Sequence, residues 1–165
     1  MEFGVSFHSL CLATSTLMTQ MRPLAQADLE HVLAITAASP EAASWSRQTY
    51  EAILQHQQHG CCYVAEVGGL AVGFVCFRVA SDEAELLNLA VLPSSRRQGI
   101  GSRLLEQTLR EAASRGATRI FLEVRETNQP ALKFYQRYSF TVSTRRGGYY
   151  SNPPADALVL ARNLA

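Results

Sequence analysis

Residues 86–115 read LLNLAVLPSSRRQGIGSRLLEQTLREAASR. The stretch begins with an apolar run that predicts a buried strand, and Pro93 with two serines ends that strand. Beyond the break, apolar residues recur at three- and four-residue steps, which predicts a helix that packs one face on the core and starts at Gly99 or just before it. The first amides of such a helix have no partner inside it and carry the positive end of its dipole. The order strand, glycine loop, helix therefore predicts a site for a phosphate group.

The spacing of the glycines narrows the choice of ligand. A Walker loop needs a lysine directly after its second glycine, and the dinucleotide fingerprint would need a glycine at Leu104, so both are excluded. Arg96 and Arg97 add positive charge, and Gly99 and Gly101 leave room for a phosphate near the amides. This arginine and glycine spacing resembles the pyrophosphate loop of the GNAT acetyltransferases, which holds the diphosphate of acetyl-CoA. An ordinary arginine-bearing turn is the alternative.

The chain has the composition of one globular domain. Of its 165 residues 47% are hydrophobic, and no internal repeat or low-complexity linker interrupts it. Residues 1–90 contain three Arg and nine acidic residues, whereas residues 91–165 contain twelve Lys or Arg and five acidic residues. The phosphate loop lies in the basic half, as expected for a polyanionic ligand. No nucleic-acid partner is expected, because no basic run alternates with aromatic residues and no DNA- or RNA-binding motif is present.

The first twenty residues, MEFGVSFHSLCLATSTLMTQ, are interpreted as a flexible extension of a single domain that spans residues 21–165. Their apolar patch has no basic residue before it, unlike a signal peptide, and it is too short and too often interrupted by hydroxyl side chains to cross a membrane. We therefore expect a cytoplasmic protein with no membrane partner.

The cysteines predict neither a disulfide nor a metal site. His56 and His59 precede two of them and could suggest a metal site, but adjacent strand residues such as Cys61 and Cys62 point to opposite faces and would not converge on one ion. No two cysteines have CxxC spacing. Reduced cytoplasmic thiols are therefore expected for Cys11, Cys61, Cys62 and Cys76.

The remaining patterns predict a single mixed α/β domain. Helices are expected over 26–38, over 46–58 with Ser46 as N-cap, and from Asn128 onward with Pro130 in the first turn. Gly68-Gly69 supplies a two-residue turn between two strands of a hairpin. Strands are expected over 21–24, 61–67, 70–79, 119–124, 140–149 and 156–164, with the acidic segment 81–85 leading into the strand of residues 86–92.

A second informative stretch, residues 122–140, reads LEVRETNQPALKFYQRYSF. Glu123 lies near the end of an expected strand and Tyr135 in the next helix, so both side chains could face one cleft. With the loop and the ending YYSNPPADALVLARNL, this stretch resembles the RimI family, the bacterial acetyltransferases of the N-terminal alanine of a small-subunit ribosomal protein. The resemblance covers the chain from about Met21 to Leu164. It rests on LLNLAVxP, RRQGIG, RGxxxxxLEVRxxN, AxxxYxxxxF and the pairs Tyr149-Tyr150 and Asp156-Ala157.

The resemblance implies a fold, a co-substrate and a reaction. The fold would be the GNAT fold, a largely antiparallel central sheet of about six to seven strands with about four helices. The co-substrate would be acetyl-CoA, with no metal. Glu123 would act as general base, directly or through a water, on an N-terminal amine whose unperturbed pKa of about 7.7–8.0 requires only a modest base. The amine would attack the thioester in a ternary complex, and Tyr135 would return a proton to the CoA sulfur.

The resemblance also implies contacts with both substrates. The strand end would pair with the pantetheine arm through its backbone, and the loop would hold the pyrophosphate. Candidates for contact with the acceptor are Trp45, Tyr149 and Tyr150. The predicted CoA contacts are Leu89, Ala90, Val91, Arg96, Arg97, Gln98, Gly99, Ile100, Gly101, Ser102 and Asn128.

Several of these residues also have a purely structural interpretation. Tyr135 and Trp45 could be core residues, Glu123 a surface carboxylate paired with a neighbouring arginine, and Asn128 a helix cap. The chain departs from the family at two places. Ser139 stands where a glycine commonly ends the tyrosine helix, and the loop 149–156 is shorter than expected.

Two function classes remain open. The first is an acetyltransferase of protein or peptide N-termini, with a ribosomal protein as the expected partner, or its close variant acting on a small amine. The second is a non-catalytic acyl-CoA-binding module. Glu123 and Tyr135 favour catalysis, because a pure binder needs neither. A monomer or weak dimer is expected.

Overall fold

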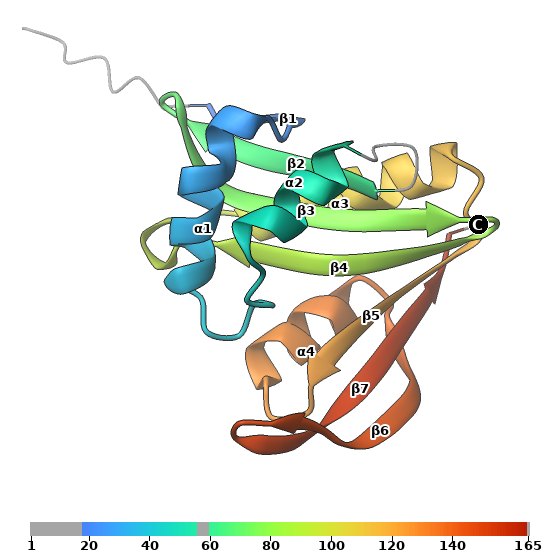
Figure 1. Cartoon of the computed structure of the whole chain (residues 1–165). Coiled ribbons are helices and arrows are strands. Elements are labelled where there is room, and N and C mark those ends of the chain that lie inside the picture. The colour runs from blue at the N-terminus through green and yellow to red at the C-terminus, as the bar shows by residue number, and fades with distance from the viewer. Residues whose placement is uncertain (1–17, 56–59, 165) are drawn as a thin grey trace, which may run out of the picture.

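The computed structural model describes residues 18–55 and 60–164. Its centre is a seven-stranded sheet with the strand order β1-β2-β3-β4-β5-β7-β6 (Figure 1). Neighbouring strands pair antiparallel except β4 and β5, which run parallel. The expected mixed α/β fold with a largely antiparallel sheet is confirmed.

In chain order the elements are β1 (Gln20–Pro23), the 3-10 helix η1 (Gln26–Asp28), α1 (Leu29–Ala37), α2 (Arg47–Gln55), β2 (Gly60–Val67), β3 (Leu70–Ala80), β4 (Glu83–Val91), the 3-10 helix η2 (Pro93–Ser95), α3 (Ile100–Ser114), β5 (Arg119–Arg125), α4 (Gln129–Arg137), β6 (Thr141–Ser151) and β7 (Pro154–Asn163).

Helices lie on both faces of the sheet, so the domain has two apolar cores. On one face, Leu104 of α3 and other helix residues pack against strand residues such as Leu122. On the other face, Ile35 of α1 and Tyr50 of α2 pack around Phe74 of β3. The sheet is thus buried on both sides near β3 and β4, which holds the end of β4 firmly in place.

The helix expected over 26–38 is divided in the structure. η1 covers 26–28, and α1 begins only at Leu29. The Asp28 carboxylate accepts a hydrogen bond from the amide of Ala25 at 2.8 Å and is paired with Arg22 at 2.7 Å. Arg22 lowers the pKa of Asp28, mainly through the hydrogen bond that its guanidinium donates to this carboxylate. These contacts favour a tight 3-10 turn before the α-helix starts.

Other boundaries agree with the expectations or differ for a clear reason. Gly68 and Gly69 form the expected hairpin turn with φ values of 60° and 84°. The acidic segment belongs to β4 from Glu83 onward, because Glu85 pairs with Arg78 of β3 at 2.8 Å. The hydroxyl of Ser46 accepts a hydrogen bond from the amide of Thr49, as expected of an N-cap. α2 ends at Gln55, and the predicted residues 56–58 lie outside the described part.

The C-terminal hairpin differs more from the prediction. The region 149–156, expected as a loop, is mostly strand, because β6 continues to Ser151 and β7 starts at Pro154. Ser139 has φ 61°, the left-handed conformation that glycine adopts most easily, so the absence of a glycine does not change the course of this turn. β1 starts at Gln20, one residue before the expected domain boundary, and residues 1–17 lie outside the described part.

The expectation of reduced thiols is wrong for two cysteines. Cys62 of β2 and Cys76 of β3 are directly opposite each other, with Cα atoms 4.2 Å apart, and their sulfur atoms form a disulfide. A search for CxxC spacing cannot find this pair, because the register of the hairpin and not the sequence separation brings it together. Cys61 is free and lies in the core on the opposite face from Cys62, as predicted. Cys11, His56 and His59 lie outside the described residues.

Within residues 18–55 and 60–164, no helix is long and apolar enough to cross a membrane.

Candidate active site

The parallel strands β4 and β5 pair over only part of their length. Their register ends at Leu86 and Leu122, although β4 continues to Val91 and β5 to Arg125. Just after this point β4 contains a bulge, because Leu87 has no partner between the pairs that Leu86 and Asn88 form with β3. Figure 1 shows β5 and β7 running away from β4. The edge of β4 at Leu89 to Val91 therefore has no neighbour in β5.

The loop after β4 presents free backbone donors. α3 starts at Ile100, one residue after the predicted start, and Gly99 before it has φ 78°. Arg97 is also left-handed, with φ 64°. Within the described part of the chain, the amides of residues 97–102 donate no hydrogen bond to another group. These unpaired donors at the positive end of a fifteen-residue helix form an anion-binding arrangement.

The two arginines of the loop have different surroundings. The Arg96 guanidinium donates hydrogen bonds to the carbonyl of Val91 and to the hydroxyl of Ser39, both at 3.0 Å. Arg97 has no ion pair among the described residues and is exposed. Gln98 donates to the carbonyl of Ser94 at 3.4 Å. The Arg96 guanidinium is thus partly engaged by other groups of the protein, whereas that of Arg97 has no ion pair among the described residues.

Glu123 lies near the end of β5, in a cluster of charged and aromatic side chains. Its carboxylate is ion-paired with Arg146 of β6 at 2.7 Å. Glu123 raises the pKa of Tyr149, chiefly because its carboxylate accepts a hydrogen bond from the Tyr149 hydroxyl. Burial and then the charge of Glu123 raise the pKa of Tyr150, whose ring lies 4.0 Å from the guanidinium of Arg125. The structure therefore brings the predicted base and two predicted acceptor contacts together.

Tyr135 is a buried residue of α4. Its ring packs against Phe134 and Phe140, with centroids 5.1 Å and 5.6 Å away. Burial raises the pKa of Tyr135 far above its usual value, so this side chain stays protonated throughout the physiological range. Its hydroxyl has no hydrogen-bond partner in the described part of the chain. In the same part, every side-chain nitrogen or oxygen that is fully buried has a hydrogen-bond partner. The Tyr135 hydroxyl is therefore not fully sealed from solvent and has no partner among the described residues.

Asn128 and Trp45 have structural contacts of their own. The Asn128 side chain accepts a hydrogen bond from the amide of Ala131 at 3.2 Å and so caps α4, as predicted. Trp45 lies in the segment between α1 and α2, with its ring 5.4 Å from that of Tyr50. No hydrogen bond joins Trp45 to Glu123 within the described residues.

Sequence reasoning missed two residues of this region. Arg146 was not singled out, because residues 146 and 149 would face opposite sides of a regular strand, and only the irregularity of β6 between Arg146 and Tyr150 brings the Arg146 guanidinium to 5.7 Å from the Tyr149 ring. Asn88 is buried on β4, and its amide group donates to the carbonyl of Ala43 at 2.9 Å and accepts from the amide of Ala43 at 3.3 Å. Only the three-dimensional structure shows that Asn88 holds the segment that carries Trp45.

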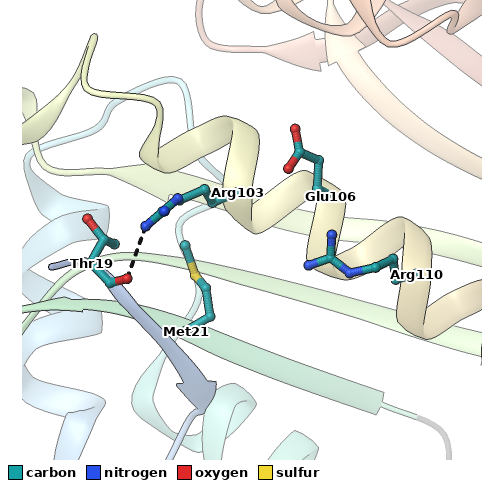
Figure 2. Close-up of a pocket in the computed structure, with 5 residues that line it drawn as sticks. All are labelled: Thr19, Met21, Arg103, Glu106 and Arg110. Atoms are coloured by element: carbon teal, nitrogen blue, oxygen red, sulfur yellow. Dashed lines mark hydrogen bonds between the residues drawn. The ribbon is translucent and has the colours of Figure 1, made fainter.

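A cavity of about 270 Å³ lies elsewhere, between β1 and α3. It is lined by Thr19, Met21, Arg103, Glu106 and Arg110, and the Arg103 side chain donates a hydrogen bond to the carbonyl of Thr19 at 3.0 Å (Figure 2). None of its lining residues is among the predicted site residues.

Residues 25–140 match the Acetyltransferase (GNAT) family. The [ribosomal protein bS18]-alanine N-acetyltransferase of Escherichia coli K12 is 35% identical over 119 residues, which cover 71% of this chain and 79% of that enzyme. The crystal structure of the ribosomal-protein-S18-alanine N-acetyltransferase from Escherichia coli matches with a TM-score of 0.79 and 30% identity, covering 90% of this chain and 95% of that one. Arabidopsis thaliana NAA60 in complex with acetyl-CoA matches with a TM-score of 0.79 over 88% of this chain and 98% of that one. At 18% identity, this last similarity shows the fold alone.

Proposed function

The chain belongs to the GNAT acetyltransferase family, and we propose that it transfers the acetyl group of acetyl-CoA to the α-amine at the N-terminus of a protein. The observation that carries the proposal is the position of two groups at the diverging ends of β4 and β5. Unpaired amides follow β4, and Glu123 with its tyrosine neighbours lies near the end of β5. Because parallel strands end at the same edge of a sheet, a thioester held by the first group can reach the second.

The proposed acetyl-CoA site uses mostly backbone. The amides of residues 97–102 would hold the pyrophosphate, with Arg97 adding charge. The free edge of β4 at Leu89 to Val91 would pair with the amide groups of the pantetheine arm, as an added strand does. Asn128 lies at the start of α4, where it could contact the arm.

The proposed reaction is a direct transfer. Glu123 accepts a proton from the acceptor ammonium, directly or through a water, and the free amine attacks the thioester carbonyl. The new C–N bond forms, the C–S bond breaks, and the sulfur leaves with its electron pair. Tyr135 gives its proton to that sulfur and is reprotonated from solvent.

The proposed acceptor is a protein that begins with alanine. The support is the similarity to the Escherichia coli enzyme named for the alanine of ribosomal protein bS18, which extends over most of both chains. The paired side chains of Tyr149 and Tyr150 lie beside Glu123 and offer aromatic surface for the first residues of a peptide. A ribosomal protein is therefore the first partner to test.

A mass-shift assay tests this proposal. The protein is incubated with acetyl-CoA and with peptides that begin Ala-Arg, Met-Leu or Ser-Glu, and with spermidine as a small-amine control. We expect a single acetyl group on the α-amine of the Ala-Arg peptide first. Acetylation of spermidine alone would overturn the peptide acceptor, and acetyl-CoA binding with no acetylated product would favour a non-catalytic binding module.

A further inference from the structure

Arg96 connects two parts of the candidate site. Its Nε donates to the carbonyl of Val91, the last residue of β4, and its Nη2 donates to the hydroxyl of Ser39 just after α1. Glu41 lies nearby, with a carboxylate oxygen 3.8 Å from the same Nη2. The side chain thus spans from the first residue of the phosphate loop to the segment 38–46 between α1 and α2.

The segment 38–46 has no helix or strand of its own, and besides its local backbone hydrogen bonds two side chains from outside the segment bond to it. Arg96 holds it near its start at Ser39, which is only 2% exposed. Asn88 of β4 holds it further along, through both backbone groups of Ala43. Trp45 follows two residues later and packs against Tyr50. The position of Trp45 is therefore set from β4 and from the phosphate loop.

We infer that Arg96 is a positioning residue that couples the acetyl-CoA loop to the acceptor-side segment 38–46, and that it is not a phosphate ligand. The inference rests on the proposed function for the identity of the two substrates. The bonds that the Arg96 guanidinium donates to Val91 and Ser39 hold it toward the segment 38–46, although its side chain is 42% exposed, whereas Arg97 next to it has no ion pair in the described part. A phosphate bound at the neighbouring amides orders the loop that Arg96 begins, and this strengthens the contact of Arg96 with Ser39. Binding of acetyl-CoA thereby changes the surroundings of Trp45.

Trp45 provides a direct readout, because it is the only tryptophan of the chain. In the wild-type protein, saturating acetyl-CoA should change the emission of Trp45. In Arg96→Gln most of this change should be lost, although calorimetry should find an acetyl-CoA affinity within about twofold of wild type. With the Ala-Arg peptide, Arg96→Gln should raise the acceptor KM by about fivefold to tenfold and leave the KM for acetyl-CoA nearly unchanged. This is the size expected for the loss of one typical hydrogen bond.

Three further variants separate positioning from charge. Arg96→Lys keeps the charge but cannot donate to two acceptors through a planar fork, so it should behave like Arg96→Gln. Ser39→Ala should weaken the emission change. The double variant Arg96→Gln with Ser39→Ala should show the same emission change and acceptor KM as Arg96→Gln alone, because both substitutions remove the same hydrogen bond. Arg97→Gln should do the opposite, lowering acetyl-CoA affinity while keeping the emission change at saturation.

Two results would overturn the inference. One is an Arg96→Gln protein that loses acetyl-CoA affinity as Arg97→Gln does, with the acceptor KM unchanged and affinity restored by Arg96→Lys. The other is a set of fully additive effects of the Arg96 and Ser39 changes. If no peptide is acetylated, the proposed function fails, but the emission and calorimetric measurements still decide whether Arg96 couples the two parts.

Discussion

The two ends of the candidate site are built in different ways. The cofactor end lies within residues 89–102, and most of its proposed contacts are backbone groups held between a buried strand and a helix. The acceptor end joins side chains from separate strands, with Glu123 on β5 and with Arg146, Tyr149 and Tyr150 on β6. A backbone site depends on φ and ψ at a few residues, whereas a side-chain site depends on charges and on strand register. Each end should therefore respond to a different kind of substitution.

The largest expected effect is on turnover. Glu123→Gln removes the proposed base and should lower kcat for the Ala-Arg peptide by about 100-fold or more, the range found for general-base catalysis. Glu126→Gln is the matched control, because Glu126 is a nearby carboxylate that pairs with Arg145 and not with the candidate site. It should keep kcat within about twofold of wild type. Equal losses in both variants would contradict a specific role for Glu123.

The next effect is on the backbone end. Gly99 has φ 78°, and a side chain at this position would meet no atom within 4 Å, so the cost of a substitution is conformational and not steric. Gly99→Val should lower acetyl-CoA affinity by about tenfold or more and stability by about 1–2 kcal/mol, because a β-branched residue avoids this conformation. Gly101→Ala, at a helical position with ordinary contacts, should leave thermal stability nearly unchanged. Calorimetry with acetyl-CoA and thermal unfolding of both proteins test this prediction. Acetyl-CoA affinity equal to wild type in Gly99→Val would show that binding does not require the left-handed conformation of residue 99.

A smaller effect concerns charge at the same end. Arg97→Gln should weaken acetyl-CoA binding by about threefold to fivefold at low salt, and the difference from wild type should shrink as salt is added, because exposed charges are screened. Affinities measured across a salt series test this. A difference that does not depend on salt would show that Arg97 acts by shaping the loop and not through its charge.

The smallest effect is electrostatic and lies at the acceptor end. Glu123 raises the pKa of Tyr149, mainly by accepting a hydrogen bond from its hydroxyl and also because its negative charge disfavours the phenolate. In Glu123→Gln the phenolate should form at a lower pH than in wild type. A pH titration of Tyr149 followed by NMR of labelled tyrosine measures this shift. An unchanged Tyr149 titration would mean that the two side chains do not interact in solution.

The same contrast explains how much of the fold could be predicted. The end of the strand and the start of the helix around Gly99 were predicted within one residue, because glycine positions and apolar periodicity report directly on backbone conformation, whereas β4 starts three residues before the predicted strand. The hairpin at Gly68-Gly69 was predicted for the same reason. The divergence of β4 and β5 was not predicted, nor was the Cys62–Cys76 pair. Both depend on how strands are placed beside one another, which local patterns do not encode.

The candidate site shows the same limit. Glu123 and Tyr135 were found through a family motif, and the structure adds what surrounds them. Arg146 was missed because its partner Glu123 lies on β5, and β7 separates the two strands in the sheet. Asn88 was missed because a buried asparagine in an apolar strand has no local signature of the segment that it holds. Contacts between distant segments are thus the part that required a structure.

The most direct test of the two-ended site is calorimetric titration of acetyl-CoA into Glu123→Gln. If the cofactor end is an independent backbone site, the affinity should equal that of wild type within about twofold, even though turnover has fallen by about 100-fold. A loss of acetyl-CoA affinity that matches the loss of turnover would contradict the assignment of Glu123 as a base acting on a separately held thioester.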